Sequence, residues 1–455
     1  MSADPSAELH AHAPPDLAHV TPAVAPSRSP WQWVPSLYFA EGLPYIVAIT
    51  VSVVMYKRLG VSNSDIALYT SWLYLPWVVK PLWSPLVELR STKRTWTLTM
   101  QFSMAAALGA VAMALGAPAF FPLTLAVLWA LAFASATHDI ACDGFYLLAL
   151  PERQAAAFVG VRSTFYRIAM VTGQGAFVVL AGELEVRFGG DSRRAWAITF
   201  AALAALLALL AAWHRFILPR PAGDAAIDLR AQGTGRADAA RERAALFVRV
   251  FVTFFAKPRI VPAMAFLLFF RFAEAQLVKL VAPFLLDARS DGGLGLTTSQ
   301  VGVAYGTVGV VALTTGGLLG GYLASRYGLR RLLWIFVAAI HLPDAIFVWL
   351  AYAQPTNLWL INSAVGVEQF GYGFGFTAYT LFMIVLAEGQ QKAAHYAMAT
   401  GIMALGMMVP GMFAGAVQEH LGYQHFFLWV LLATIPGFAV AALVRVDPEY
   451  GRRSA

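Results

Sequence analysis

Long uninterrupted runs of apolar residues constrain this chain more than any other feature of its sequence. Twelve runs can be drawn, over residues 33–56, 66–87, 96–117, 121–149, 155–182, 195–218, 259–286, 298–324, 331–353, 357–387, 393–418 and 423–445. Runs of about 18 to 25 residues match the hydrocarbon thickness of a bilayer. Only 13% of the residues are charged, against roughly a quarter in soluble domains. The sequence therefore predicts an all-α membrane protein with twelve transmembrane helices.

A polar stretch divides the twelve runs into two equal sets. Residues 220–249 contain Gly, Asp and Arg and no run long enough to span a membrane. The halves share a local pattern, since Leu150-Pro-Glu152 precedes QAAAF and Leu386-Ala-Glu388 precedes KAAHY. Such internal repeats are typical of secondary transporters. We expect two six-helix bundles, in this order along the chain: a disordered cytoplasmic tail (1–30), the N-terminal six-helix bundle (31–219), a cytoplasmic linker (220–256), the C-terminal six-helix bundle (257–446) and a cytoplasmic tail (447–455).

The distribution of basic residues predicts the orientation of the chain. The net charge is +7, and basic residues gather in the loops on one side of the predicted spans, including the stretch 215–259. The loops of the other side carry fewer, namely Lys57, Arg58, Arg187, Arg193, Arg194 and Arg289. Cytoplasmic loops are enriched in Lys and Arg. We therefore expect a multi-pass protein of the bacterial inner membrane with both termini in the cytoplasm, and no nucleic-acid partner.

Features that would indicate an enzyme or a cofactor are missing from the sequence. Cys142 is the only cysteine, and no GxxxxGK[ST] phosphate-binding motif occurs. The histidines of the N-terminal tail (His10, His12 and His19) are too few and too loosely spaced to favour a metal site. A membrane-embedded transferase would need a nucleophile or metal constellation at a membrane face, and none is apparent. We expect no cofactor, no metal and no enzymatic activity.

Ionisable residues inside the predicted spans indicate a polar cavity between the bundles. Each costs at least about 2.5–3.5 kcal/mol in the middle of a bilayer and so needs a partner, a cavity or a function. Asp139 and Asp143 are four residues apart, on one face of span four. Two carboxylates in a low dielectric resist double ionisation, and His138 beside them titrates near neutral pH. We expect these three residues to couple protons or contact substrate.

Other charged residues of the first half would join this site. Glu41, Lys80 and Arg167 lie within spans one, two and five. The alternative is that the two aspartates only form salt bridges with Arg167 or Lys80. Arg162 is nearer the cytoplasmic end of span five, where we expect an interfacial or gating residue.

The second half offers a further set of charged residues. On span seven, Arg271 and Glu274 are three residues apart, and Lys279 follows within a quadrant of the helical wheel from Arg271. Together with Glu368 and Gln369 of span ten, they would line a cavity for an anionic substrate. Alternatively, Arg271 and Glu274 form a local ion pair that stabilises the bundle. His341 and Asp344 lie on span nine, where we expect a lesser role.

Three segments of the first half contain closely spaced charged, glycine and proline residues: LYFAEGLPY (37–45), PWVVKPLWSPLVE (76–88) and ATHDIACDGF (136–145). They resemble the AmpG-like branch of the major facilitator superfamily, which includes muropeptide permeases, siderophore importers and acetyl-CoA transporters. The resemblance implies proton-driven import by alternating access, with its motif residues at Gly42-Leu43-Pro44, Lys80, Asp139 and Asp143. The second half also carries the facilitator loop GGYLASRYGLRRL (320–332). By this resemblance the gating residues of the two loops are Glu88, Arg326, Arg330 and Arg331.

Two departures concern the substrate. Muropeptide permeases typically place a basic residue soon after the second aspartate and often carry extra C-terminal helices. Here Gly144-Phe145-Tyr146 follows Asp143, and the predicted spans end at twelve. The sequence predicts a proton-coupled importer of an amino sugar, a muropeptide or a similar anionic solute, acting as a monomer in the lipid bilayer. A siderophore permease, or a membrane receptor that no longer transports, is the alternative.

Overall fold

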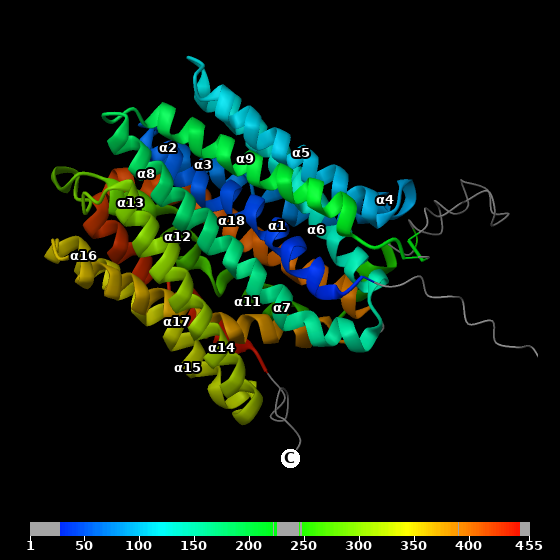
Figure 1. The fold of residues 1–455 in the computed structure, drawn as a ribbon. Helices are drawn as coiled ribbons and strands as arrows, with labels where there is room; N and C mark the ends of the chain where they lie inside the picture. The colour runs from blue at the N-terminus through cyan, green and yellow to red at the C-terminus, as the bar shows by residue number, and fades with distance from the viewer. Residues whose placement is uncertain (1–27, 222, 225–244, 246–247, 390, 446–455) are drawn as a thin grey trace, which may run out of the picture.

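The computed structural model describes residues 28–221, 223–224, 245, 248–389 and 391–445, and the described chain is almost entirely helical (Figure 1). Within these residues no β-strand occurs. Most of the predicted linker (220–256) and nearly all of the two predicted tails (1–30 and 447–455) lie outside the described residues, so these bounds stay predictions.

Six spans make up the first half, several of them built from more than one helical segment. They are α1 (Val34–Ile46), η2 (Val47–Val51) and α2 (Ser52–Arg58); α3 (Asn63–Trp72) and α4 (Leu75–Arg90); α5 (Lys93–Ala114); α6 (Phe120–Ala149); α7 (Glu152–Met170), η3 (Val171–Phe177) and α8 (Val178–Arg187); and α9 (Ser192–Ile217). The segments η2 and η3 are π-helical stretches inside otherwise α-helical spans. Such bulges are frequent at functional sites.

The second half repeats this plan. Its spans are α11 (Ile260–Phe269) and α12 (Phe272–Leu286); α13 (Thr298–Val301), η5 (Gly302–Gly309) and α14 (Val310–Tyr327); α15 (Leu329–His341), η6 (Leu342–Asp344) and α16 (Ala345–Ala353); α17 (Leu358–Ala387); and α18 (Lys392–Leu432) continued by α19 (Ile435–Leu443). Within α18, Gly422 has φ 72° and ψ 164°, which ends one span and begins the next. A positive φ is readily adopted only by glycine.

The number of spans agrees with the sequence. Ten helical stretches among the described residues are long and apolar enough to cross a membrane. The stretch Ala394–Leu443 contains two spans because it bends back at Gly422. The pair α3 and α4 supplies the remaining span, which gives the predicted twelve. In Figure 1 the helices α5 and α9 lie at one edge of the molecule and α15 and α16 at the other.

The two halves meet mainly along two pairs of spans, in which α3 and α4 contact α18, and η3 and α8 contact η5 and α13. Both contacts depend on glycine. A Cβ atom at Gly306 would overlap the backbone carbonyl of Gln174, and one at Gly415 would overlap that of Asn63. Small residues allow this close approach of transmembrane helices. Gly306 and Gly415 thus allow the two halves to pack closely at both contacts.

Polar contacts between the halves concentrate at one end of the bundles, which we call the closed end. Lys57 and Asp287 form an ion pair at 2.6 Å, and the Asn63 side-chain amide donates to the Tyr423 hydroxyl at 2.9 Å. Thr298 donates to Glu185 at 2.6 Å. The opposite end, where α4, α6 and α9 finish and the linker leaves the first half, is the linker end. Ion pairs and hydrogen bonds thus join the halves at the closed end.

Candidate functional site

A cavity of about 660 Å³ lies between the two halves. Its walls come from α1, α4, α7 and η3 of the first half and from α12, η5, α17 and α18 of the second. Val159 and Thr400 are among its lining residues, and both lie about two turns from the linker ends of their helices. The cavity therefore extends toward the linker end, and the contacts of the closed end lie beyond its other extremity. Its volume is in the range of ligand pockets, about 300–1,000 Å³.

The charged lining of the cavity is strongly unbalanced. Four lining side chains are cationic, namely Lys80, Arg162, Arg167 and Arg271, and Glu41 is the one carboxylate among the lining residues. Behind this lining, the predicted aspartates provide partners for two of the cations. Lys80 is paired with Asp139, and Arg162 with Asp143. The Tyr38 hydroxyl also donates to Asp143, at 3.0 Å.

Asp139 and Asp143 occupy one face of α6, as their spacing predicts, and Glu41 lies close enough to interact electrostatically with both. Glu41 is buried, and its Oε2 atom has no hydrogen-bond partner. The structure thus brings three carboxylates and two cations together on the first-half side of the cavity. A proton added to Asp139 would remove the charge that holds Lys80.

Arg167 and Arg271 differ from the other two cations because their partners are neutral. Arg167 donates to the Thr314 hydroxyl across the interface between the halves at 3.5 Å. Arg271 donates to the Tyr372 hydroxyl and lies over the rings of Tyr372 and Phe376. Within the part of the chain that the structure describes, neither guanidinium forms an ion pair with a carboxylate. Two cations facing one cavity from opposite halves can bind an anionic ligand bidentately.

Aromatic side chains form much of the remaining wall. The lining set comprises Tyr38, Tyr45, Tyr74, Trp77, Tyr166, Tyr305, Tyr372 and Phe376. Tyr45 and Trp77 meet edge to face, with ring centroids 5.0 Å apart. Gln174 and Gln369 contribute amide groups to the same cavity. Aromatic faces combined with a few polar groups suit a solute that carries rings as well as charge.

His138 and Lys279, both predicted as site residues, do not line the cavity. His138 is buried and is hydrogen-bonded to Gln101 at 3.0 Å. Gln101 in turn contacts His214 at 2.8 Å, so His138 belongs to a polar chain between helices of the first half. Lys279 is buried between the halves, donates to Thr70 at 3.0 Å and lies 5.2 Å from the centre of the Tyr74 ring. His138 does not line the cavity, and its proton-coupling role stays a prediction.

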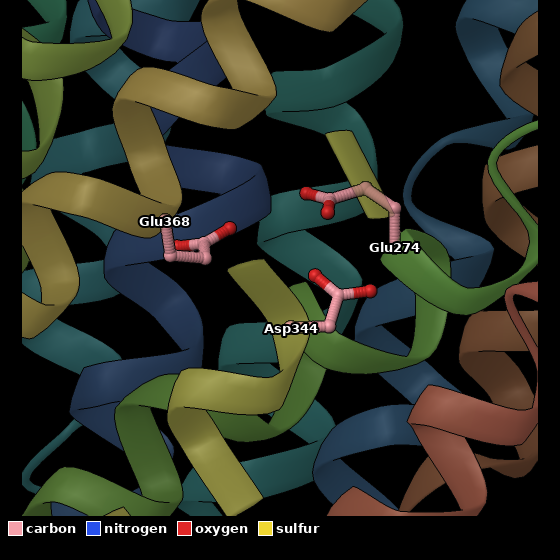
Figure 2. A group of neighbouring side chains, drawn as sticks. All are labelled: Glu274, Asp344 and Glu368. Atoms are coloured by element: carbon pink, nitrogen blue, oxygen red, sulfur yellow. The ribbon is translucent and has the colours of Figure 1, made fainter. Parts of the chain in front are cut away.

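The expected pairing of Arg271 with Glu274 does not occur in the form of an ion pair. Instead Glu274 lies beside Asp344 and Glu368, and carboxylate oxygens of all three are within 4.8 Å of one another (Figure 2). These side chains lie behind the cavity wall that Arg271 and Gln369 form. A lesser role was expected for Asp344 from its place on span nine. The structure instead makes it part of the acidic cluster of the second half.

The predicted gating residues lie at the linker end, away from the cavity. Arg326 is exposed in the last turn of α14 and donates to the Tyr322 hydroxyl at 3.3 Å. Arg330 and Arg331 are exposed in the first turn of α15. Glu88 lies in α4, and its side chain is outside the described residues. Their gating role stays a prediction.

Arg162 is the main residue whose position in the structure differs from the membrane interface expected from the sequence. Its position near the start of span five suggested the membrane interface, yet it lines the cavity and pairs with Asp143. It also lies over the rings of Tyr38 and Tyr146, at 4.2 and 4.5 Å from their centres. The cavity reaches so far toward the linker end that a residue in the third turn of α7 faces it. The three aromatic and acidic partners could not be assigned from spacing along the chain.

Two bundles of six membrane-spanning helices around a central charged cavity define a secondary membrane transporter. The chain belongs to the Major Facilitator Superfamily, whose family model matches residues 36–415. This confirms the predicted fold class and family.

Known relatives come from the same branch. The chain is 26% identical to the anhydromuropeptide permease of Escherichia coli (strain K12) over 424 residues, which cover 91% of this chain and 80% of the permease. It is 24% identical over 430 residues to the putative transporter AmpG 4 of Rickettsia conorii, covering 89% of this chain and 94% of that protein. The predicted resemblance to AmpG-like proteins is therefore confirmed, and the relatives are transporters.

Solved structures show the same fold at lower sequence identity. The D-xylose-proton symporter has a TM-score of 0.66 and 11% identity, with 91% of this chain and 95% of that chain covered. The nucleoside transporter NupG has a TM-score of 0.65 and 17% identity, with 92% of this chain and 99% of that chain covered. A bacterial homologue of the human lysosomal transporter Spinster, in an inward-facing and unoccupied conformation, also has a TM-score of 0.65, with 17% identity, 92% of this chain and 96% of that chain covered.

Proposed function

We propose that this protein is a proton-coupled importer of an anionic amino-sugar solute of the anhydromuropeptide kind. One observation carries the proposal. Arg167 and Arg271 face the central cavity from opposite halves, and within the described part of the chain both are hydrogen-bonded to neutral hydroxyl groups and not paired with a carboxylate. A carboxylate of the solute would bind both guanidiniums, while the tyrosine-rich wall would contact its sugar rings. The relatedness to a permease for anhydromuropeptides supports this substrate class.

Anion binding by the two arginines would also favour movement of the halves. A ligand held by one residue of each half stabilises the conformation in which the halves approach each other around it. Alternating access in this architecture is a rocking of one half against the other. The ion pairs and hydrogen bonds of the closed end, such as Lys57 with Asp287, would have to open in each cycle.

The proton would be carried by the first-half carboxylates. Asp139 neutralises Lys80, and Glu41 adds a further carboxylate beside them. Protonation of Asp139 would release Lys80 to the cavity and to an anionic solute, so that solute and proton favour each other's binding. Asp143 and Arg162 form a second pair that can respond in the same way.

The expected orientation of the chain in the membrane supports import as the direction of transport. Basic loops gather at the linker end, which the positive-inside rule assigns to the cytoplasm, together with both termini. The cavity extends toward that end, whereas the closed end would face the periplasm. In an inner-membrane protein this is the conformation that releases an imported solute. Each chain contains both halves and hence a complete pathway, so a monomer suffices.

Uptake of labelled 1,6-anhydro-muropeptide tests this proposal. Cells that lack their own permease would express the wild-type chain, Asp139→Asn or the exposed control Arg187→Gln, with and without a proton uncoupler. We expect accumulation with the wild type that both the uncoupler and Asp139→Asn abolish, and that the control retains. Accumulation that persists with the uncoupler would contradict proton coupling.

Two other outcomes would select the alternative functions. No uptake by a correctly inserted wild-type chain would contradict the muropeptide substrate, and labelled ferric siderophores would be the next solute to measure. Specific binding of anhydromuropeptide without any accumulation would instead indicate a receptor that does not transport.

A further inference from the structure

The acidic cluster of the second half is formed where two spans are interrupted. Glu274 lies in the first turn of α12, directly after the break between α11 and α12. Asp344 lies at the end of η6, which interrupts span nine, and precedes α16. Glu368 comes from the middle of α17. Figure 2 shows the three carboxyl groups pointing toward one shared space.

The carboxylates are buried and largely without partners. Glu274, Asp344 and Glu368 are each 1% exposed. Among the described residues, none provides a hydrogen-bond partner to either carboxylate oxygen of Glu274 or of Asp344. Glu368 accepts one hydrogen bond, from Gln369 at 2.9 Å. Buried charges are normally paired or bound to a metal ion, because an isolated buried charge is very unfavourable.

The neighbouring cations do not neutralise the cluster. Arg271 is close enough to act electrostatically on Glu274, but its guanidinium is hydrogen-bonded to Tyr372. The Lys279 ammonium is directed to Thr70. Ionisation of all three carboxyl groups would leave two negative charges that the one guanidinium does not compensate. The positive end of a helix dipole favours the ionised form in its first turn, where Glu274 lies.

The spacing of the oxygens is suited to a single metal ion. One oxygen of each of the three residues lies within 4.8 Å of the others. Oxygen ligands of Ca²⁺ lie about 2.3–2.6 Å from the ion, so two of them are up to roughly 5 Å apart. One cation at the centre can therefore contact all three carboxylates.

We propose that Glu274, Asp344 and Glu368 form a binding site for a hard, oxygen-preferring metal cation inside the second half, separate from the transport cavity. This proposal differs from the expectation from the sequence, which was that the protein binds no metal. Discontinuous helices at mid-membrane are a common setting for coupling ions in transporters.

The site also has a route to the cavity. Glu274 lies one turn from Arg271, and Glu368 is next to Gln369, and both of these neighbours line the cavity. A cation bound by the carboxylates would weaken the attraction of Glu274 for Arg271 and leave the guanidinium to an anionic solute. This coupling step rests on the proposed function, whereas the metal site itself does not.

Direct binding of radioactive ions tests the site. Purified protein, without any solute, would be titrated with ²²Na⁺, ⁴⁵Ca²⁺ or ²⁸Mg²⁺ in a choline buffer at mildly alkaline pH. We expect saturable binding of at least one of these ions to a single site. Asp344→Asn and Glu368→Gln should each weaken it at least tenfold, and the exposed control Asp291→Asn should leave it unchanged.

The proposal is overturned if the folded wild-type protein binds none of the three ions, or if binding is the same in Asp344→Asn and Glu368→Gln as in the wild type. The first result does not depend on the folding of any variant. Because the titration contains no solute, failure of anhydromuropeptide uptake would leave its result interpretable. The coupling step is tested separately: the ion that binds should raise solute affinity in the wild type and have no effect in Asp344→Asn.

Discussion

The two halves of this transporter share an arrangement of helices but differ in how their buried charged residues are paired. In the first half, Asp139 is paired with Lys80 and Asp143 with Arg162. In the second half, Glu274 and Asp344 have no hydrogen-bond partners, and Arg271 is bonded to a neutral tyrosine. The first half is thus close to internally neutral, whereas the second keeps its positive and negative groups apart.

This difference suggests a division of labour. Paired charges respond to a proton, because protonation of the carboxylate releases the cation. Separated charges respond to larger ligands, so that Arg271 is left for an anion and the carboxylate cluster for a metal cation. Breaking either arrangement by substitution should therefore change stability in opposite directions in the two halves.

The largest effect is expected from Lys80→Met, which leaves Asp139 without its partner. Removing one member of a buried ion pair costs about 3–5 kcal/mol, and the lower end of this range applies here because the two side chains are 24% and 21% exposed. Thermal unfolding of the purified protein would measure the loss. The double variant Lys80→Met, Asp139→Asn should recover much of the stability. If it is as unstable as Lys80→Met alone, the pair is not coupled.

Arg271→Gln and Arg167→Gln should each weaken solute binding while preserving the fold. A hydrogen bond to a charged group contributes about 1.5–3 kcal/mol, which corresponds to a roughly 10- to 150-fold loss of affinity. Titration of the purified variants with anhydromuropeptide would measure this. Arg187→Gln, at an exposed position of the closed end, is the matched control. Equal affinity of Arg271→Gln and the control would exclude an arginine contact to the solute.

Asp344→Asn should change the stability of the protein in the direction opposite to Lys80→Met. In a buffer free of metal ions, neutralising one of three adjacent unpaired carboxylates relieves repulsion, so we expect stabilisation by about 1 kcal/mol. Thermal unfolding in such a buffer is the measurement. Destabilisation of Asp344→Asn under these conditions would show that the carboxylate has a favourable partner and that the halves do not differ in this respect.

The smallest effect is expected from His138→Gln. His138 contacts Gln101 within the first half and does not line the cavity. Loss of this hydrogen bond should lower stability by about 1 kcal/mol, with uptake unchanged per inserted molecule. Uptake that becomes independent of the proton gradient in this variant would restore the proton-coupling role predicted from the sequence.

The fold was predictable because the membrane imposes it. A span needs a minimum apolar length, and the boundaries of spans such as Phe120–Ala149 and Leu358–Ala387 fall within one residue of those drawn from the sequence. The site was only partly predictable. Helical spacing correctly places Asp139 and Asp143 on one face, but it does not say which helix that face meets.

Contacts between distant spans account for what sequence reasoning missed. His138 adjoins Asp139 along the chain, yet the helical turn directs it toward Gln101 of α5. Arg162 and Asp143, or Asp344 and Glu368, come together only through the packing of separate spans. A helical wheel treats each span alone and cannot reveal such pairs. The short breaks before Glu274 and at η6 also lack a distinctive apolar pattern, although Pro343 lies within the second.

An anion site between the halves can be tested by comparing the binding of anhydromuropeptide with that of an analogue whose carboxylates are converted to amides. Both compounds would be titrated into the purified wild-type protein and the double variant Arg167→Gln, Arg271→Gln. We expect the wild type to bind the acid at least about tenfold more tightly than the amide, a difference of about 1.4 kcal/mol, and the double variant to lose this preference. Equal affinity of the wild type for both compounds, or an undiminished preference in the double variant, would contradict an anion site between the two halves.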